Sequence, residues 1–312
     1  MNEIDVIRTN HLVDPALHIW GWEVPVYLFL GGLAAGVMIA TALIAAAMPL
    51  RQRSAALRWL PFAAPVALSL GMGALFLDLE HKAYVWRFYA ALRLTSPMSW
   101  GAWILLGIYP ATLLLGLASL TDQDLARLQR FLPGPLSRWA AGAQSWAQHR
   151  ELGLRSVNVV LGLGLGVYTG VLLGAMGARA VWNSALLGPL FLTSGASAGA
   201  AFLLLFRLAD HERRELARWD RLALLVELGL IALFLVGLLN GSAQAQAGAH
   251  QLLGGRFTAQ FWALVVVAGL AVPWFLATFE AKKHSRPTMA APLLVLVGGL
   301  SLRWILVAAG QA

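Results

Sequence analysis

Long apolar runs alternate with short polar connections along almost the whole chain. Eight of these runs reach the length of about 20 residues that a helix needs to cross roughly 30 Å of hydrocarbon. They are continuous and rich in Leu, Ala and Gly, whereas the strands of a membrane barrel alternate apolar and polar positions. The pattern therefore predicts an all-α polytopic membrane protein with eight transmembrane helices, at 22–48, 59–79, 99–120, 154–176, 184–208, 222–240, 257–279 and 290–309.

The composition supports this interpretation. Of 312 residues, 59% are hydrophobic and only 12% are charged, which is more apolar surface than a soluble domain of this length can bury. We expect one membrane domain, 1–312. The longest connection, 121–153, has the spacing of short amphipathic helices broken at Pro133 and Pro135, and we interpret it as dividing the chain into two four-helix halves, 1–153 and 154–312.

The net charge of +8 reflects membrane topology, not nucleic-acid binding. Of the 23 basic residues, 16 follow the first, third, fifth and seventh apolar runs, on one side of an eight-helix arrangement. Cytoplasmic loops of membrane proteins carry the excess of Lys and Arg. We therefore expect both termini to lie outside, on the periplasmic face.

Cysteine and histidine usage narrows the chemistry. The sequence has no cysteine, so it supplies no thiolate to an iron–sulfur cluster and contains no disulfide. A cytochrome b would place haem-ligating histidines inside its helices, but all seven histidines fall in loops or at helix ends: His11, His18, His81, His149, His211, His250 and His284. We expect no haem and no bound metal.

Most polar side chains within the apolar runs lie at one depth, in the outer half of the membrane. An arginine inside a spanning helix costs at least about 2.5 kcal/mol on insertion scales, so it should face other helices and find an acid. One interpretation is a salt bridge that fixes helix packing, and the other is a functional site. The residues concerned are Glu23, Tyr27, Asp78, His81, Tyr168 and Arg303.

Five segments in fixed order resemble the NrfD/PsrC family of membrane subunits, which is named for nitrite and polysulfide reductase systems. They are WGWEVPVYLFLGGLAAG (20–36), TSPMSWGAW (95–103), VYTGVLLGAM (167–176), PLFLTSGASAGAA (189–201) and GGLSLRWILVAAGQ (298–311). The resemblance extends from the first helix to the last. No single segment is a strict fingerprint, and the order and spacing of all five carry the match.

The resemblance implies a function in the bacterial inner membrane. Such subunits are haem-free anchors that react with a quinone, menaquinone or ubiquinone, near the periplasmic face. They exchange electrons with a separate ferredoxin-like protein that holds four [4Fe–4S] clusters. Through it they are coupled to a catalytic protein that is often a molybdopterin enzyme. The chain would thus act as part of a multi-subunit oxidoreductase and not as an enzyme alone.

The family resemblance also bears on the site. Some members present Asn and His from the first helix to the quinone, whereas this chain has Val24 and Tyr27 at those positions, which makes Glu23 the polar group expected there. Tyr168 lies in a segment that resembles the helix 4 tyrosine of the family. We expect Tyr27, Tyr168 and Arg303 to bind quinone.

Quinone chemistry explains the remaining residue types. A quinone and its quinol differ by two electrons and two protons, so the site needs hydrogen-bond donors and a group that exchanges protons near pH 7. Partial desolvation beside apolar walls raises the pKa of a carboxylate toward this range. Glu23 and Asp78 are therefore the candidate acid–base groups. His81, at the water boundary, would pass protons outward.

Glu227 is the exception to the outward placement of polar residues. It lies about six residues into the sixth helix from the cytoplasmic side, with Asn158 at comparable depth in the fourth. Together they form a candidate proton path. The alternative is an acid that reaches the interface or bonds to a neighbouring helix.

Two other classes of function stay open. A structural anchor would hold a partner without touching quinone, and its acids and arginine would merely pin helices together. A secondary transporter would have broken helices and polar residues at the midplane, which fits the outward distribution less well.

Overall fold

The computed structural model describes residues 20–79, 81–90, 93, 95–175, 179–283 and 288–311. In this part of the protein all regular elements are helical, and eight segments are long and apolar enough to cross a membrane. They are Glu23–Ala47, Ala55–Asp78, Met98–Ala118, Glu151–Gly174, Leu187–Leu204, Asp210–Leu239, Thr258–Glu280 and Ala290–Gln311. The predicted all-α class and the eight spans are confirmed.

The spans correspond to the following elements. Helices α1 (Glu23–Ala47), α5 (Pro97–Ala118), α8 (Glu151–Gly174), α9 (Leu187–Leu204), α10 (Asp210–Leu239) and α14 (Ala290–Gln311) each form one span. The second span combines α2 (Ala55–Trp59), a 3-10 turn (Leu60–Phe62) and α3 (Ala63–Asp78). The seventh combines α12 (Thr258–Gln260), a π-helical segment (Phe261–Ala271) and α13 (Val272–Lys283).

The largest difference from the predicted bounds is at the start of α10. The apolar run begins at 222, but the helix begins twelve residues earlier, at Asp210. The carboxylate of Glu212 accepts hydrogen bonds from the backbone N–H groups of Ala209 and Ser54, at 2.9 and 2.8 Å. These bonds stabilise a charged first turn outside the apolar run, where hydropathy alone does not reveal a helix.

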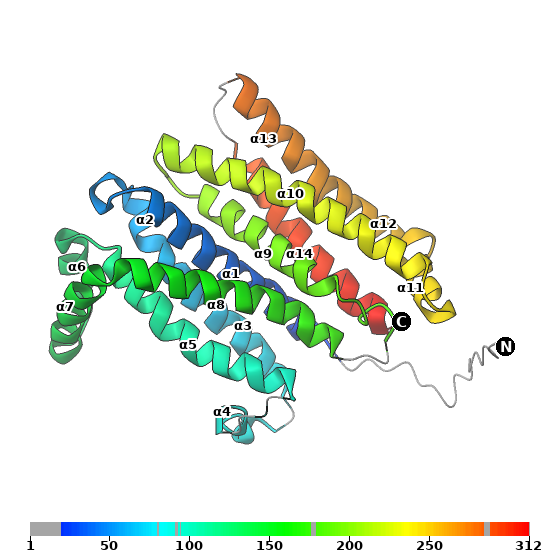
Figure 1. Ribbon diagram of the computed structural model, residues 1–312, viewed down its shortest axis with the longest axis horizontal. Coiled ribbons are helices and arrows are strands. Elements are labelled where there is room, and N and C mark those ends of the chain that lie inside the picture. Colours follow the sequence, from blue (N-terminus) through cyan, green and yellow to red (C-terminus); the bar gives the residue numbers. More distant parts are fainter. Residues whose placement is uncertain are drawn as a thin grey trace.

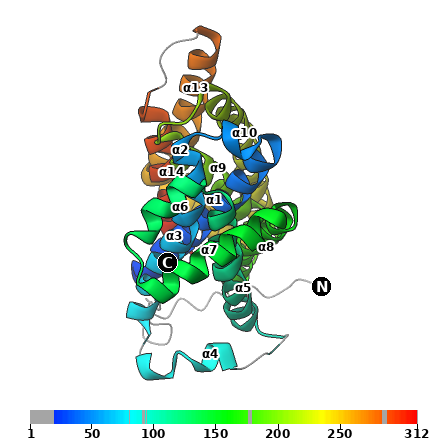
Figure 2. The same ribbon diagram turned by 90° about the vertical axis from the view of Figure 1, so that its left-hand side faces the viewer.

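The spans form two groups of four that meet along α1 and α9. Helix α1 packs against α3, α8 and α9, and α9 packs between α8 and α10. Figures 1 and 2 both show α5 and α13 on opposite sides of α1 and α9. The groups are therefore α1, α2–α3, α5 and α8 on one side, and α9, α10, α12–α13 and α14 on the other.

The long connection does not separate these two groups. Three spans precede residue 153 and five follow it, so the halves 1–153 and 154–312 do not coincide with the groups of four. The boundary falls between α8 and α9, because α8 packs against α1 and α5. Order along the sequence does not show which neighbours the fourth span has.

Glycine lets α1 and α9 approach closely. A Cβ on Gly36 would clash with the backbone of Gly195 and Gly199, and a Cβ on Gly195 would lie 2.7 Å from the carbonyl oxygen of Gly32. Small residues are the usual device for close packing of membrane helices. This contact fixes α1 as the wall shared by the two groups.

The connection at 121–153 folds into α6 (Asp122–Gln129) and α7 (Gly134–His149), at the end of the bundle opposite the C-terminus (Figure 1). Ion pairs tie this end together: Arg53 contacts Glu151 at 2.8 Å, and Arg58 contacts Asp124 at 2.6 Å. The other end carries the start of α1, the short helix α4 (Arg87–Ala90) and α11 (Ala243–Leu253).

Candidate functional site

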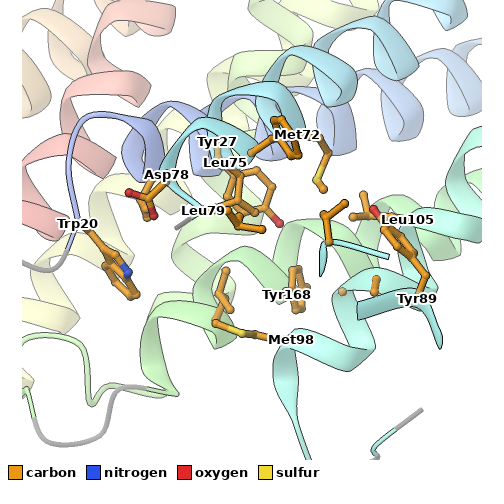
Figure 3. A pocket seen from close by; sticks show the side chains of 16 residues that line it. Trp20, Tyr27, Met72, Leu75, Asp78, Leu79, Tyr89, Met98, Leu105 and Tyr168 are labelled. Carbon is orange, nitrogen blue, oxygen red and sulfur yellow. The ribbon is translucent and has the colours of Figure 1, made fainter. Parts of the chain in front are cut away.

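A cavity of about 280 Å³ lies within the first group of helices, at the end where α1 begins. Its walls come from α1, α3, α5 and α8, and two segments outside these helices complete it with Trp20 and Tyr89 (Figure 3). Most of the lining is apolar. The polar side chains are three tyrosines, Tyr27, Tyr89 and Tyr168, together with Asp78 and Trp20, which carries an indole N–H.

Helical spacing directs these side chains to a common space. Met72 and Leu75 are three residues apart on α3, and Tyr168 and Leu172 are four apart on α8, so each pair shares a helix face. Gly101 of α5 provides room, because a Cβ there would clash with the ring and hydroxyl of Tyr168. The GAW segment that begins at Gly101 thus allows α8 to present its tyrosine to the cavity.

The structure brings together Tyr27 and Tyr168, two residues that the sequence placed only in the same half of the membrane. Both are buried, with 2% and 7% of their surfaces exposed. Their hydroxyl groups are close enough to interact, and Figure 3 shows both rings at the cavity. Two phenol groups on neighbouring helices therefore form the polar part of an otherwise apolar wall.

Tyr89 reaches the same cavity from α4. Burial and the neighbouring Tyr109 raise the pKa of the Tyr89 hydroxyl above its usual value. A tyrosine hydroxyl is protonated at neutral pH in any case, so this group can donate a hydrogen bond. The segment KAYVWRFY that contains Tyr89 gave no indication of this role, because a helix of one turn leaves no periodic signal.

The two predicted acids lie in different settings. Asp78 is the last residue of α3 and lines the cavity. Glu23 is the first residue of α1, where a negative charge is favourable beside the helix N-terminus, and its carboxylate folds back over Gly21. Glu23 does not line the cavity, but it is near enough to act electrostatically on Asp78.

His81 lies outside the cavity. It precedes the 3-10 turn Lys82–Tyr84, is exposed, and its ring centroid is 6.4 Å from that of Tyr84. This position at the surface is compatible with the predicted role in passing protons to water. It gives no direct contact with a molecule in the cavity.

Arg303 is fully buried between α14, α1 and α9, on the other side of α1 from the cavity. Its guanidinium donates hydrogen bonds to the carbonyl oxygens of Leu28 (3.1 Å), Phe191 (3.2 Å) and Gly299 (2.9 Å) and to Ser194 Oγ (3.1 Å). It also lies over the ring of Phe191, 5.0 Å from the centroid. The sequence had led us to expect an acid partner at the depth of Glu23 and Asp78.

The acid that acts on Arg303 is instead Glu227 of α10. Ser194 connects the two residues, because it accepts a hydrogen bond from Arg303 and also interacts with Glu227. One helical turn further along α9, Ser197 donates to the carboxylate of Asp220 at 2.7 Å. We call these five residues, Ser194, Ser197, Asp220, Glu227 and Arg303, the inner polar cluster.

Asp220 and both serines of this cluster were not predicted from the sequence. The signal was present: Asp220 and Glu227 are seven residues, or about two turns, apart and so share a face of α10. Asp220 was not identified as a buried residue, because it precedes the apolar run and its neighbours in the sequence are typical of a charged loop. Ser194 and Ser197 stood out only as part of a family-like segment.

Asn158 and Glu227 lie in different places. The amide of Asn158 donates to the carbonyl oxygens of Ala111 (2.9 Å) and Leu154 (2.8 Å), between α5 and α8. Glu227 belongs to the inner polar cluster, and α9 packs between the two helices that carry these residues. The structure therefore does not bring the pair together.

Comparison with known proteins agrees with the five family-like segments. A family model described as polysulphide reductase, NrfD, matches residues 10–312. The sequence is 33% identical to protein NrfD of Escherichia coli (strain K12), over 94% of this chain and 95% of that protein. It is 32% identical to one of the chains of the polysulfide reductase of Wolinella succinogenes, over 94% of both sequences.

A more distant relative is a subunit of the selenate reductase of Mesobacillus selenatarsenatis, which is 25% identical over 92% of this chain and 73% of its own length. By their names, two of these three relatives are parts of reductase complexes. The family model covers nearly the whole sequence, and two relatives are more than 30% identical over almost their full length. The chain therefore belongs to the NrfD family.

Proposed function

We propose that this chain is the quinone-reactive membrane subunit of a respiratory reductase complex in the bacterial inner membrane. The single observation that carries the proposal is the cavity, which combines apolar walls with the hydroxyls of Tyr27, Tyr89 and Tyr168 and the carboxyl group of Asp78. A quinone needs apolar contact for its ring and tail and polar groups for its two oxygens. Ligand pockets typically have this combination.

The position of the cavity suits an exchange of electrons at the membrane surface. It lies at the end of the bundle where α1 begins, beside α4, so a bound ring would be close to one surface. We assign this end to the periplasmic side, because the excess of Lys and Arg lies in the connections at the other end. The proposed partner is a four-cluster [4Fe–4S] ferredoxin-like subunit docked over the outer loops 80–98 and 241–256, with a molybdopterin-type catalytic subunit beyond it.

Each polar residue then has a role. Tyr168 and Tyr27 would hold one quinone oxygen, because a phenol can both donate and accept a hydrogen bond. Asp78 would exchange the protons that accompany electron transfer, with Glu23 modulating its charge. His81 would carry protons between Asp78 and water. Arg303, separated from the cavity by α1, would act on the site only through the backbone of Leu28, next to Tyr27.

A cavity-filling variant tests the proposal. Ala102 lines the cavity and is 7% exposed, so Ala102→Phe would occupy the space of the quinone ring. Leu225→Phe is the matched control, because Leu225 is 47% exposed on the outer face of α10. We expect reduction of the partner's clusters by menadiol to fall at least about tenfold in Ala102→Phe and to stay unchanged in Leu225→Phe.

The result also separates the alternatives. A structural anchor, or a transporter, would assemble equally well and lose nothing specific to quinol when Ala102 is enlarged. Normal menadiol-dependent cluster reduction per assembled complex in Ala102→Phe would therefore contradict the proposal. The amount of assembled complex must be measured in the same samples, so that misfolding is not read as lost turnover.

We propose the proton path through Glu227 and Asn158 separately from the quinone site. Such a path would have to cross α9, because Asn158 is bonded within the first group of helices and Glu227 lies in the second. Glu227→Gln retains size and hydrogen bonding but removes titration. If Glu227 conducts protons, this variant should lower proton uptake from the cytoplasmic side in vesicles. Asn158→Ala should lower proton uptake as well only if Asn158 and Glu227 lie on one path.

A further inference from the structure

Trp20 closes one side of the cavity although it precedes the first helix. Its indole is half-buried and lines the cavity on the same side as Asp78 (Figure 3). Helix α1 begins three residues later, at Glu23, so the helix does not set the position of Trp20. Other contacts must hold this wall in place.

The first of these contacts comes from Gln311, at the opposite end of the sequence. The backbone N–H of Trp20 donates to Gln311 Oε1 at 2.9 Å, and Gln311 Nε2 donates to the carbonyl oxygen of Trp20 at 3.1 Å. One carboxamide thus satisfies both backbone groups of one residue. An amide side chain suits this arrangement, because its donor and its acceptor are on separate atoms.

The second contact is a ring stack. Trp182, from the segment before α9, stacks on Trp20 with ring centroids 4.9 Å apart and planes inclined by 26°. Trp182 is 1% exposed, and its Nε1 donates to the carbonyl oxygen of Leu306 at 2.8 Å. Gly310 leaves room for it, since a Cβ at that position would clash with the indole. Helix α14 therefore supports Trp20 both directly and through Trp182.

We propose that Gln311 is a positioning residue for the quinone site, because it fixes Trp20 as the wall of the cavity next to Asp78. The inference rests on the proposed function. Gln311 touches no residue of the cavity other than Trp20 in the contacts above, so its effect passes through the backbone of that residue. Loss of the amide should loosen ligand binding and leave the acid–base and electron-transfer groups intact.

The test uses the whole complex with menadiol as the electron donor. In Gln311→Ala, we expect the KM for menadiol to rise about tenfold and kcat to change less than twofold, the size expected for one or two lost hydrogen bonds. Gln311→Glu keeps the size and the acceptor but sets a carboxylate oxygen against the carbonyl oxygen of Trp20, and should give a rise at least as large. Gln123→Ala is the control, because Gln123 is an exposed glutamine of α6, at the end of the bundle opposite Gln311 (Figure 1).

A double variant shows whether Gln311 acts through Trp20. If it does, Gln311→Ala should add little to the KM increase caused by Trp20→Ala, because the wall is already absent. Additive effects would overturn the inference, as would an unchanged KM in both Gln311 variants. A smaller amount of assembled complex with an unchanged KM for menadiol would show a purely structural role for Gln311. That result would also overturn the inference.

The proposed function and this inference fail in different ways. If the wild-type complex does not react with menadiol and Ala102→Phe has no effect, the quinone site itself is wrong. If the wild type reacts and Ala102→Phe is impaired, but the Gln311 variants behave like Gln123→Ala, only the positioning role of Gln311 is wrong.

Discussion

Two buried regions flank α1, and their chemistry differs. On one side lies the cavity, an open space with tyrosine hydroxyls and one carboxyl group. On the other lies the inner polar cluster, where Arg303 is fully buried and makes four hydrogen bonds within the protein. A satisfied, closed network stabilises a structure, whereas polar groups that face an empty space can serve a ligand.

Helix α1 connects these regions through consecutive residues. Tyr27 faces the cavity, and the carbonyl oxygen of Leu28 accepts a hydrogen bond from Arg303. The comparison predicts that variants of the inner polar cluster affect chiefly the amount of folded protein. Variants of the cavity should affect chiefly turnover per folded protein.

The largest expected effect is on Arg303. Arg303→Met would leave the carboxylate of Glu227 and several acceptors without their cation, at a cost of about 3–5 kcal/mol for a buried charge that loses its partner. We expect little assembled protein in the membrane, measured by size-exclusion chromatography of detergent extracts. Arg218→Met is the control, since Arg218 is an exposed arginine of α10. Normal yield of Arg303→Met would contradict the stabilising role of the cluster.

The next effect separates the two acids. Asp78→Asn removes the titrating group of the cavity and should lower menadiol turnover roughly 10²-fold, the scale of a lost general acid or base, without loss of assembly. Glu23→Gln should cost much less, because Glu23 does not line the cavity. Equal losses in both variants would mean that Glu23 exchanges protons directly. Normal turnover in both would remove the carboxylates from the mechanism.

A smaller effect is expected for the tyrosines. Tyr168→Phe and Tyr27→Phe each remove one hydroxyl from the cavity and should lower kcat/KM for menadiol about tenfold. Thr112→Val is the control, because it removes a buried hydroxyl that does not line the cavity and donates within α5, to the carbonyl oxygens of Ile108 and Tyr109. If all three variants behave alike, the hydroxyls of Tyr27 and Tyr168 do not hold the quinone.

Most of the fold could be predicted because membrane spans have a simple physical signature. Their length and apolarity are local properties, and all eight spans were found from them. The start of α10 was not predicted, because a charged turn stabilised by Glu212 lies outside the apolar run. The grouping of α8 with α1 and α5 was not predicted either, since it depends on helix packing and not on order along the sequence.

The site was harder to predict because sequence gives the depth of a residue but not its direction. Glu23, Asp78 and Arg303 share a depth, yet Asp78 faces the cavity, Glu23 turns back over Gly21, and Arg303 lies behind α1. Tyr27 and Tyr168 were expected only in the same half of the membrane, and the structure places both at the cavity. Trp20 and Tyr89 come from segments outside the long helices, where periodicity says nothing about direction.

Photoaffinity labelling with an azidoquinone tests the central claim most directly, because it reports where the ring binds whatever the direction of electron flow. The complex is labelled with and without excess menadione, and the labelled peptides of this protein are identified by mass spectrometry. We predict labels that menadione suppresses within 72–79, 98–105 and 165–172, the cavity-lining parts of α3, α5 and α8, and their loss in Ala102→Phe. Suppressible labels confined to α10 or to the π-helical segment Phe261–Ala271 would contradict a quinone site in this cavity.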